Sequence, residues 1–369
     1  MAAASLRLLL NDAKKSERCL LMPACHDAMS AKLIQQAGFK VAFMSGYAVS
    51  ATHLALPDCG LISYGEQLQI GRCCVDATRG KLCIIGDGDT GFGGSGNVKR
   101  TIRGYAAAGF AAMSIEDQCY PKRCSYARGL AVEPRDAAIT RVRAAVAARD
   151  EMREEGLDLL IIGRTDCRNA AEHGGLDEAI ARCKAFAEAG CEVVYAEGLA
   201  GQAEMRSLNQ ALKGYACATM LAQVERPTAP AAPSGTAPKA NAAERPLVPP
   251  PEAAKLGYTL SLMGLTILNV AIKAMTAALA AMASGSHPSK DSRLTFDELY
   301  QQVMRGSRIP SLCRVLSPSL CRVISPRAGR LRRPLRMGGS LPGADGGCSE
   351  GVGPQHEQWL ARCRWDAGR

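Results

Sequence analysis

The sequence predicts an α/β fold in which eight parallel strands and their helices close into a (β/α)8 barrel. Three observations support this expectation. Short apolar runs alternate with segments of helical period, glycine recurs where those helices end, and polar residues follow the strands at equivalent positions. Eight such units are more typical of a closed, TIM-type barrel than of an open sheet. We therefore expect residues 1–306 to form a single barrel domain.

The strands are predicted from eight short apolar runs separated by helical patterns. The runs cover residues 19–22, 40–44, 82–86, 111–115, 159–163, 192–196, 215–221 and 258–263. Gly38, Gly109, Gly190 and Gly257 each stand where a helix must stop before the next strand. A left-handed residue at that point is cheapest as glycine, so these positions predict a repeated hinge between helix and strand.

Three further segments frame the barrel. Residues 1–15 have a short apolar patch that predicts a leading amphipathic helix, with an organelle-targeting peptide as the alternative. Residues 256–283 are apolar enough to suggest a membrane span, but Asn269 and Lys273 interrupt the run. We favour a buried strand followed by an amphipathic helix, and expect no membrane association. Residues 294–306 predict a last helix.

Two segments differ in composition from the barrel. Residues 225–251 are rich in Ala and Pro and predict an extended, solvated insertion before the eighth strand. Residues 307–369 hold 11 Arg against 4 Asp or Glu, a charge of +7 out of the chain's +10, and we expect a disordered basic tail there. The barrel itself then carries only about +3, which argues against nucleic-acid binding by its surface.

The cysteines indicate a reducing compartment. The chain has 16 of them, without CxxC pairs or a secretory signal, which is typical of reduced thiols. We expect a cytoplasmic protein, with targeting by a short N-terminal peptide as the alternative.

Polar side chains follow five of the predicted strands. Because carboxyl ends of the strands of such a barrel meet at one mouth, these residues should form one site. They are Ser45, Asp87 with Asp89, Glu116 with Asp117, Arg164 with Asp166, and Glu197.

The pair Asp87 and Asp89 suggests a cation site. Two carboxylates at the end of a buried strand are costly unless a cation lies between them. With Glu116 they offer the oxygen ligands that suit Mg²⁺ or Mn²⁺. The glycines at 91, 93 and 96 also match a dinucleotide-binding pattern, but the two carboxylates would repel a pyrophosphate, so we favour the cation site over that alternative.

The segment after Glu116 contains a candidate reactive thiol. Lys122 and Arg123 precede Cys124, and neighbouring cations lower the pKa of a thiol. Such a cysteine could act as an acid or base, although a lone cysteine is more often inert.

Several motifs together carry a resemblance to a known family. They are MPACHDAMSAKLIQQAGF, MSGYAVSATHLALPDCG, GDGDTGFGG, SIEDQCYPKRCS, GRTD and YAEG, in that order. The chain resembles the isocitrate lyase and phosphoenolpyruvate mutase superfamily, most of all its branch of dimethylmalate lyase, methylisocitrate lyase and petal death protein, often labelled carboxyvinyl-carboxyphosphonate phosphorylmutase. The resemblance implies a barrel whose last helix is exchanged between subunits of a dimer or tetramer. It also implies Mg²⁺-dependent cleavage, through an enolate, of a carbon–carbon bond in a small 2-hydroxy or 2-keto dicarboxylate, with oxaloacetate hydrolysis as a close variant.

The resemblance also implies roles for single residues. Ser45, Gly46 and Tyr47 would hold the substrate carboxylate with Arg164, and Glu197 would contact the distal part of the substrate. Asp87, Asp89 and Glu116 would bind the metal, with Asp58 as a nearby catalytic or supporting carboxylate. Cys124, beside Lys122 and Arg123, would protonate the departing carbanion.

The chain departs from the family pattern at several places. Ser125 and Tyr126 stand where the lyases have Gly-His, Thr219 stands near a usual asparagine, and Gly264 replaces a usual proline. These departures motivate a second hypothesis, a barrel that binds a metal–carboxylate ligand, or serves as a scaffold, without turnover.

Overall fold

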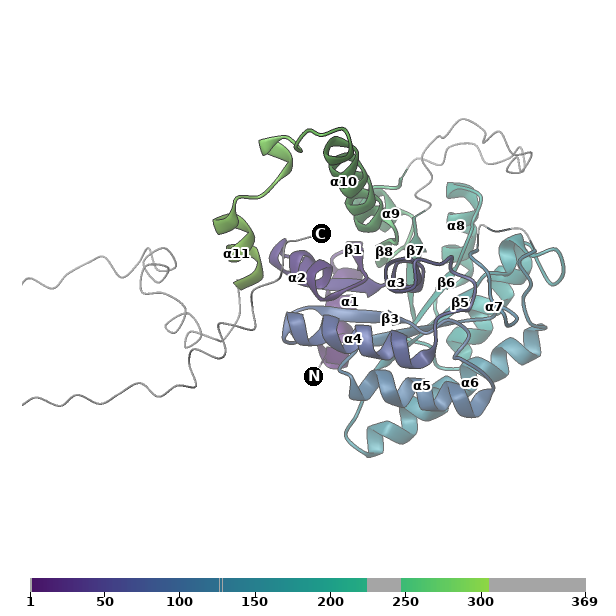
Figure 1. The fold of residues 1–369 in the computed structure, drawn as a ribbon. Helices are drawn as coiled ribbons and strands as arrows, with labels where there is room; N and C mark the ends of the chain where they lie inside the picture. Colours follow the sequence, from purple (N-terminus) through teal and green to yellow (C-terminus); the bar gives the residue numbers. More distant parts are fainter. Residues whose placement is uncertain (1, 126, 128, 224–246, 305–369) are drawn as a thin grey trace, which may run out of the picture. The chain divides into compact units, whose positions relative to one another are not determined.

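The fold is a closed barrel of eight parallel strands in sequence order, seen in a computed structural model (Figure 1). The structure describes residues 2–125, 127, 129–223 and 247–304. Each strand pairs in parallel with its neighbour, and β8 closes the ring on β1 through the pairs Leu20–Leu260 to Pro23–Met263. The predicted fold class is therefore confirmed.

The observed strands agree with the predicted runs to within three residues at each end. They are β1 Leu20–Cys25, β2 Val41–Met44, β3 Cys83–Asp87, β4 Ala112–Glu116, β5 Leu160–Thr165, β6 Val193–Ala196, β7 Ala218–Ala222 and β8 Leu260–Met263. The four hinge glycines all have positive φ, between 89° and 103°, as a left-handed helix end requires.

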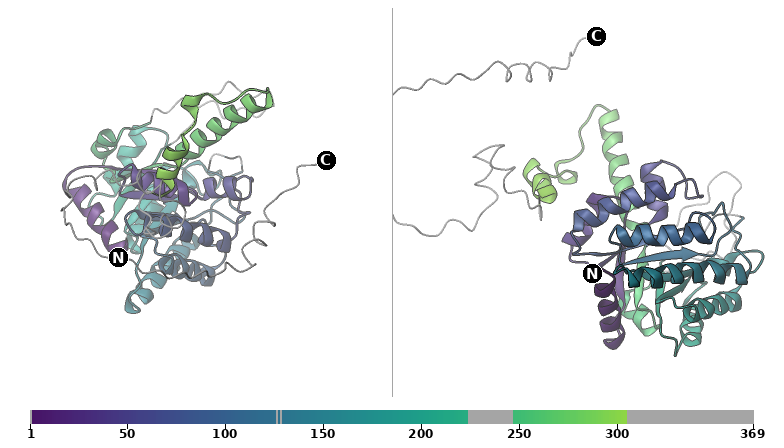
Figure 2. Two further views of the ribbon diagram at one scale, coloured as in Figure 1. Left: turned by 60° about the vertical axis from the view of Figure 1, so that its left-hand side comes forward. Right: turned by 90° about the horizontal axis from the view of Figure 1, so that it is seen from below.

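Helices surround the barrel and also continue beyond it along the chain (Figure 2). They are α1 Ala2–Lys15, α2 Ala28–Gln36, α3 Gly46–His53, α4 Tyr64–Thr78, α5 Ser95–Ala107, α6 Arg135–Glu154, α7 Leu176–Glu188, α8 Gln202–Ala211, α9 Pro250–Lys255, α10 Thr266–Ala283 and α11 Phe296–Met304, with short 3₁₀ turns η1 Cys167–Asn169 and η2 Lys290–Ser292.

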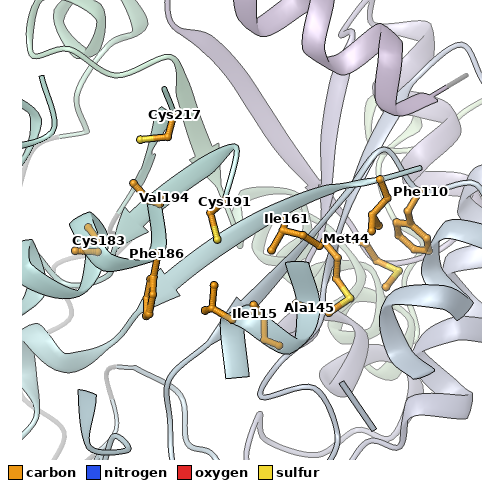
Figure 3. Packing of buried hydrophobic residues seen from close by; sticks show 14 of the residues in the cluster. Met44, Phe110, Ile115, Ala145, Ile161, Cys183, Phe186, Cys191, Val194 and Cys217 are labelled. Atoms are coloured by element: carbon orange, nitrogen blue, oxygen red, sulfur yellow. The ribbon is translucent and has the colours of Figure 1, made fainter. Parts of the chain in front are cut away.

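The core has two layers because strand side chains alternate between the inside and outside of the barrel. One set of buried residues, including Phe43, Ile85 and Ile162, fills the barrel. The other set, including Met44 and Phe186, packs between the strands and the surrounding helices (Figure 3). At the carboxyl ends of the strands, beyond these two apolar layers, the residues at the mouth are polar.

The leading helix α1 closes the amino-terminal end of the barrel. Its Leu6 and Leu10 belong to the same buried cluster as the residues inside the barrel. Lys14 donates to the carbonyl of Cys217, just before β7. The expectation of an amphipathic leading helix is confirmed, because only one face of α1 is buried.

The end of the barrel domain differs from expectation in one respect. Strand β8 is buried as predicted, and α11 falls within the predicted last helix. Helix α10, however, buries only Leu268 and exposes large apolar side chains, so it does not pack on the barrel as an amphipathic helix would. By length and composition α10 could cross a membrane. A single helix of this kind is only weak evidence for a membrane span.

The two compositionally distinct segments lie largely outside the described residues. Of the predicted insertion at 225–251, only residues 247–251 are described, and they belong to the barrel: Val248 is buried and α9 begins at Pro250. Proline at the start of a helix costs nothing, because the first amide donors have no partner within the helix. The predicted tail at 307–369, and Tyr126, also lie outside the described residues.

Candidate active site

The alternation of the strands carries a ring of polar side chains to the mouth. Residues inside the barrel occur at every second position, and continuing that pattern to the carboxyl ends of the strands leads to six buried or partly buried positions. They are His26, Ser45, Asp87, Glu116, Arg164 and Glu197. Five of these were predicted as site residues. His26 was not, although the same alternation along β1 would have found it.

Asp87 and the start of α3 hold each other in place. The Gly46 amide donates to Asp87 Oδ2 at 3.1 Å. A Cβ on Gly46 would lie 3.0 Å from Asp87 Oδ2 and 3.1 Å from Asp89 Oδ1, so any side chain there would press on both carboxylates. Ser45 accepts a hydrogen bond from the Ala48 amide and thus caps α3, while Tyr47 is at the exposed surface of the mouth.

Lys122 is buried among the carboxylates. Its Nζ lies 2.6 Å from Asp58 Oδ1 and 2.5 Å from Asp89 Oδ1. Burial lowers the pKa of Lys122, but the charges of Asp89, Glu116 and Asp58 outweigh it and raise that pKa well above its usual value. Burial also raises the pKa of Asp89 to about 6. The lysine is therefore a fixed cation in the site, and not a free neighbour of Cys124 as its place in the sequence suggests.

Asp89 and Glu116 both cost folding free energy, one through its backbone conformation and the other through the burial of its carboxylate. Asp89 adopts a left-handed backbone with φ 47°, which is strained for a residue other than glycine. Glu116 is 2% exposed, and neither carboxylate oxygen accepts a hydrogen bond from any described residue. Its Oε2 lies 3.1 Å from Arg164 Nη1, an ion pair without hydrogen-bond geometry. Burial raises the pKa of Glu116 well above its usual value. Buried carboxylate oxygens without hydrogen-bond partners are typical of a site that awaits a ligand.

Arg164 is oriented by three different groups. Its Nε donates to Asp166 Oδ1 at 3.1 Å, its Nη2 donates to Ser125 Oγ at 2.7 Å, and its Nη1 faces Glu116. The guanidinium also lies over the ring of Tyr195, 5.7 Å from the centroid. A planar guanidinium held in this way can still present N–H groups to a carboxylate.

The segment around Cys124 is fastened to the mouth on both sides of the thiol. The Arg123 amide donates to Gln118 Oε1 at 2.8 Å, and Gln118 Nε2 donates to Asp166 Oδ2 at 2.6 Å. Ser125 donates to Asp166 Oδ1 at 3.2 Å. Cys124 itself is partly exposed. The Arg123 guanidinium lies near Gly129, where a Cβ would be 3.2 Å from its Nη1.

A buried ion pair supports the site from behind. Asp117 Oδ1 accepts from the Asp166 amide, and its Oδ2 accepts from Thr165 and from Arg182 Nη1 at 2.9 Å. Arg182 is completely buried and also donates to Glu178 at 2.8 Å. The sequence placed Asp166 at the mouth without a separate task and did not point to Gln118 or Arg182, because their importance depends on contacts between distant segments.

Of two further predicted residues, Thr219 lies away from the mouth and Glu197 lies at it. Thr219 is near the start of β7, and its hydroxyl donates to Asn209 and to the Gly257 carbonyl, far from the carboxyl end of that strand. Glu197 is buried at the end of β6, and its Oε1 accepts from the Gly198 amide.

The three predicted metal ligands are present but not drawn together. Asp87, Asp89 and Glu116 are all buried at the ends of β3 and β4. Within the described residues no group of three His, Cys, Asp or Glu side chains is arranged to hold a metal ion. Lys122 now neutralises part of their charge. The donor set still fits a hard divalent cation, since the oxygens of Glu116 lack hydrogen-bond partners.

Buried acids, a buried lysine and an oriented arginine at the mouth of a (β/α)8 barrel define an enzyme site. The phosphoenolpyruvate phosphomutase family matches residues 10–284. The 2,3-dimethylmalate lyase of Eubacterium barkeri is 32% identical over 80% of this chain and 92% of its own length. The petal death protein of Dianthus caryophyllus is 39% identical over 55% of this chain, a match that spans 61% of that relative.

A solved structure agrees with these sequence relatives. Oxaloacetate acetylhydrolase in complex with its product oxalate has a TM-score of 0.70 and 26% identity, over 82% of this chain and 94% of its own. The chain belongs to the phosphoenolpyruvate mutase and isocitrate lyase superfamily, whose related members are lyases and mutases.

Proposed function

We propose that the protein is a carbon–carbon lyase that cleaves a small 2-hydroxy or 2-keto dicarboxylate through an enolate. The observation that supports it most is the arrangement of Arg164, Glu116 and the Lys122–Asp58 pair, with Cys124 in a segment that Ser125 ties to Arg164. An arginine suits the substrate carboxylate, and a thiol suits proton delivery to a carbanion. The relatives named for dimethylmalate lyase and oxaloacetate acetylhydrolase act on substrates of this size.

In this proposal each residue has a separate task. Arg164 binds the substrate carboxylate, with the amides at the start of α3 beside it. Asp58, at 2.6 Å from Lys122, takes the proton of the 2-hydroxyl group. The alkoxide oxygen forms a carbonyl as the carbon–carbon bond breaks, the electron pair of that bond passes to the departing fragment as an enolate, and Cys124 Sγ gives that carbanion a proton.

A divalent cation completes the proposed site. Asp87, Asp89 and Glu116 would hold Mg²⁺ or Mn²⁺, and Lys122 would have to withdraw from Asp89 to admit it. The ion, when bound, supplies Lewis-acid stabilisation of negative charge on the substrate.

The first test is a panel of substrates. Purified protein with Mg²⁺ should turn over at least one of dimethylmalate, methylisocitrate, isocitrate and oxaloacetate, and EDTA should stop the reaction. Product formation is followed by coupled assay and by mass spectrometry. Oxalate binding by folded protein without turnover of any substrate would contradict the lyase and favour the second candidate, a non-catalytic carboxylate-binding barrel.

We also propose that the protein is a homo-oligomer through α10 and α11. Exposed apolar side chains on these helices include Val270, Met275, Leu279 and Phe296, and a second copy is the partner that would bury them. Helix α11 meets α2 only through the side chains of Lys32 and Gln36 and two backbone carbonyls in the hydrogen bonds described.

Replacing two of these apolar residues should dissociate the oligomer. Light scattering after size exclusion should give a dimer or tetramer for the native chain and a smaller species for Met275→Glu with Leu279→Glu. Leu8→Glu changes an equally exposed leucine on α1 and should leave the mass unchanged. A monomeric native chain, or flotation of that chain with lipid vesicles, would contradict the proposal.

A further inference from the structure

Ser125 lies between two charged residues of the site. The residue is 7% exposed, and its hydroxyl accepts from Arg164 Nη2 at 2.7 Å while donating to Asp166 Oδ1 at 3.2 Å. A hydroxyl has both a donor and an acceptor, so one atom satisfies the cation and the anion together. Neither glycine nor alanine at this position could replace these contacts.

The same contacts fix the plane of the Arg164 guanidinium. Arg164 Nε and Ser125 Oγ share a single acceptor, Asp166 Oδ1, so the three groups form a closed triangle of hydrogen bonds. The triangle engages the edge of the guanidinium formed by Nε and Nη2, because both nitrogens donate within it. Loss of the Ser125 hydroxyl would leave Nη2 without this partner and the guanidinium held by Asp166, Glu116 and the Tyr195 ring.

Ser125 also follows Cys124 directly in the chain. The other side of the thiol is tied through the Arg123 amide to Gln118, which donates to the second oxygen of Asp166. The hydrogen bonds on both sides of Cys124, through Gln118 and through Ser125, therefore end on the carboxylate of Asp166. That carboxylate is in turn fixed by the bond from its own amide to Asp117.

We propose that Ser125 is a positioning residue that couples carboxylate binding by Arg164 to the placement of Cys124. The inference rests on the proposed function, because it assigns Arg164 to the substrate carboxylate and Cys124 to proton transfer. When a substrate carboxylate binds Arg164, the hydrogen bond between Arg164 and the Ser125 hydroxyl restrains the position of the adjacent Cys124 thiol. The side chain of Ser125 thereby orients the loop through its hydrogen bonds. The glycine that the family has at this position has no side chain to do so.

The experiment compares Ser125→Ala with Ser125→Thr, which keeps the hydroxyl, and with Ser207→Ala as a control. Ser207 is exposed on α8 and its hydroxyl donates only within that helix in the contacts described. Two readouts are needed: kcat and KM on the substrate that the panel identifies, and the alkylation rate of Cys124 by iodoacetamide with and without saturating oxalate. Peptide mass spectrometry separates Cys124 from the other cysteines.

We expect Ser125→Ala to raise KM about tenfold and to lower kcat about tenfold, since a hydrogen bond to a charged group is removed. Oxalate should change the alkylation rate of Cys124 in the native chain and in Ser207→Ala but not in Ser125→Ala. Ser125→Thr should recover part of both effects. If threonine does not fit the buried position, the double variant Ser125→Ala with Asp166→Asn still tests the coupling, because its losses should fall short of the product of the single losses.

The outcomes separate this inference from the proposed function. Turnover by the native chain with unchanged KM and unchanged oxalate response in Ser125→Ala would overturn the inference alone. No oxalate response in the native chain would overturn it as well. An oxalate response that depends on Ser125 without any turnover would support the coupling and contradict the lyase.

Discussion

Glu116→Gln is expected to reduce turnover by about 10²–10³-fold while leaving the fold as stable as before, or more so. The carboxylate is buried and lacks hydrogen-bond partners among the described residues, so it costs folding free energy that a neutral amide does not. The same charge is the one best placed to meet a cation and to balance Arg164 during catalysis. Activity assays and urea unfolding should therefore change in different directions.

The metal dependence gives a second readout for this substitution. Mg²⁺ should raise the melting temperature of the native chain, because a ligand that binds only the folded state stabilises it, and should not do so in Glu116→Gln. Glu155→Gln is the matched control, since Glu155 is an exposed acid just after the carboxyl end of α6 that pairs with Arg103. Full activity in Glu116→Gln, or an equal response of both variants to Mg²⁺, would exclude Glu116 from the site.

Most of the fold is encoded locally, which is why it could be predicted from the sequence. The strands are continuous apolar runs because both of their faces are buried, and Gly38 or Gly190 marks the end of a helix through its own backbone. Side chains alternate between the two faces of a strand, so the positions inside the barrel determine which strand-end residues point into the mouth. Asp87, Glu116 and Arg164 agree with this alternation.

The parts that could not be predicted depend on contacts between distant segments. Lys122 was expected beside Cys124, but its long side chain reaches Asp58 and Asp89, and no local pattern encodes that choice. Ser125 was first noted as a lost glycine, whereas the structure makes it a bridge between Arg164 and Asp166. The apolar composition of α10 also leaves open which surface covers the helix, because a helix that packs on the barrel and one that packs on a second copy of the chain are both apolar.

Arg182→Met is expected to cost about 3–5 kcal/mol of unfolding free energy, the largest stability effect that we predict. Arg182 is completely buried, and without it Asp117 would keep a buried charge beside Thr165 and the Asp166 amide. Burial and the charge of Asp166 raise the pKa of Asp117, while Thr165, the Asp166 amide and Arg182 lower it, so loss of Arg182 removes the one opposite charge among these groups. Urea unfolding followed by circular dichroism measures the loss.

A matched control and a double variant identify the cause of that loss. Arg135 pairs with the same Glu178 as Arg182 does but is exposed, so Arg135→Met should cost less than about 1 kcal/mol. Arg182→Met with Asp117→Asn should be more stable than Arg182→Met alone, because the unpaired charge is then gone. Equal losses in Arg182→Met and Arg135→Met would show that the charge of Asp117 does not depend on Arg182 for its stability.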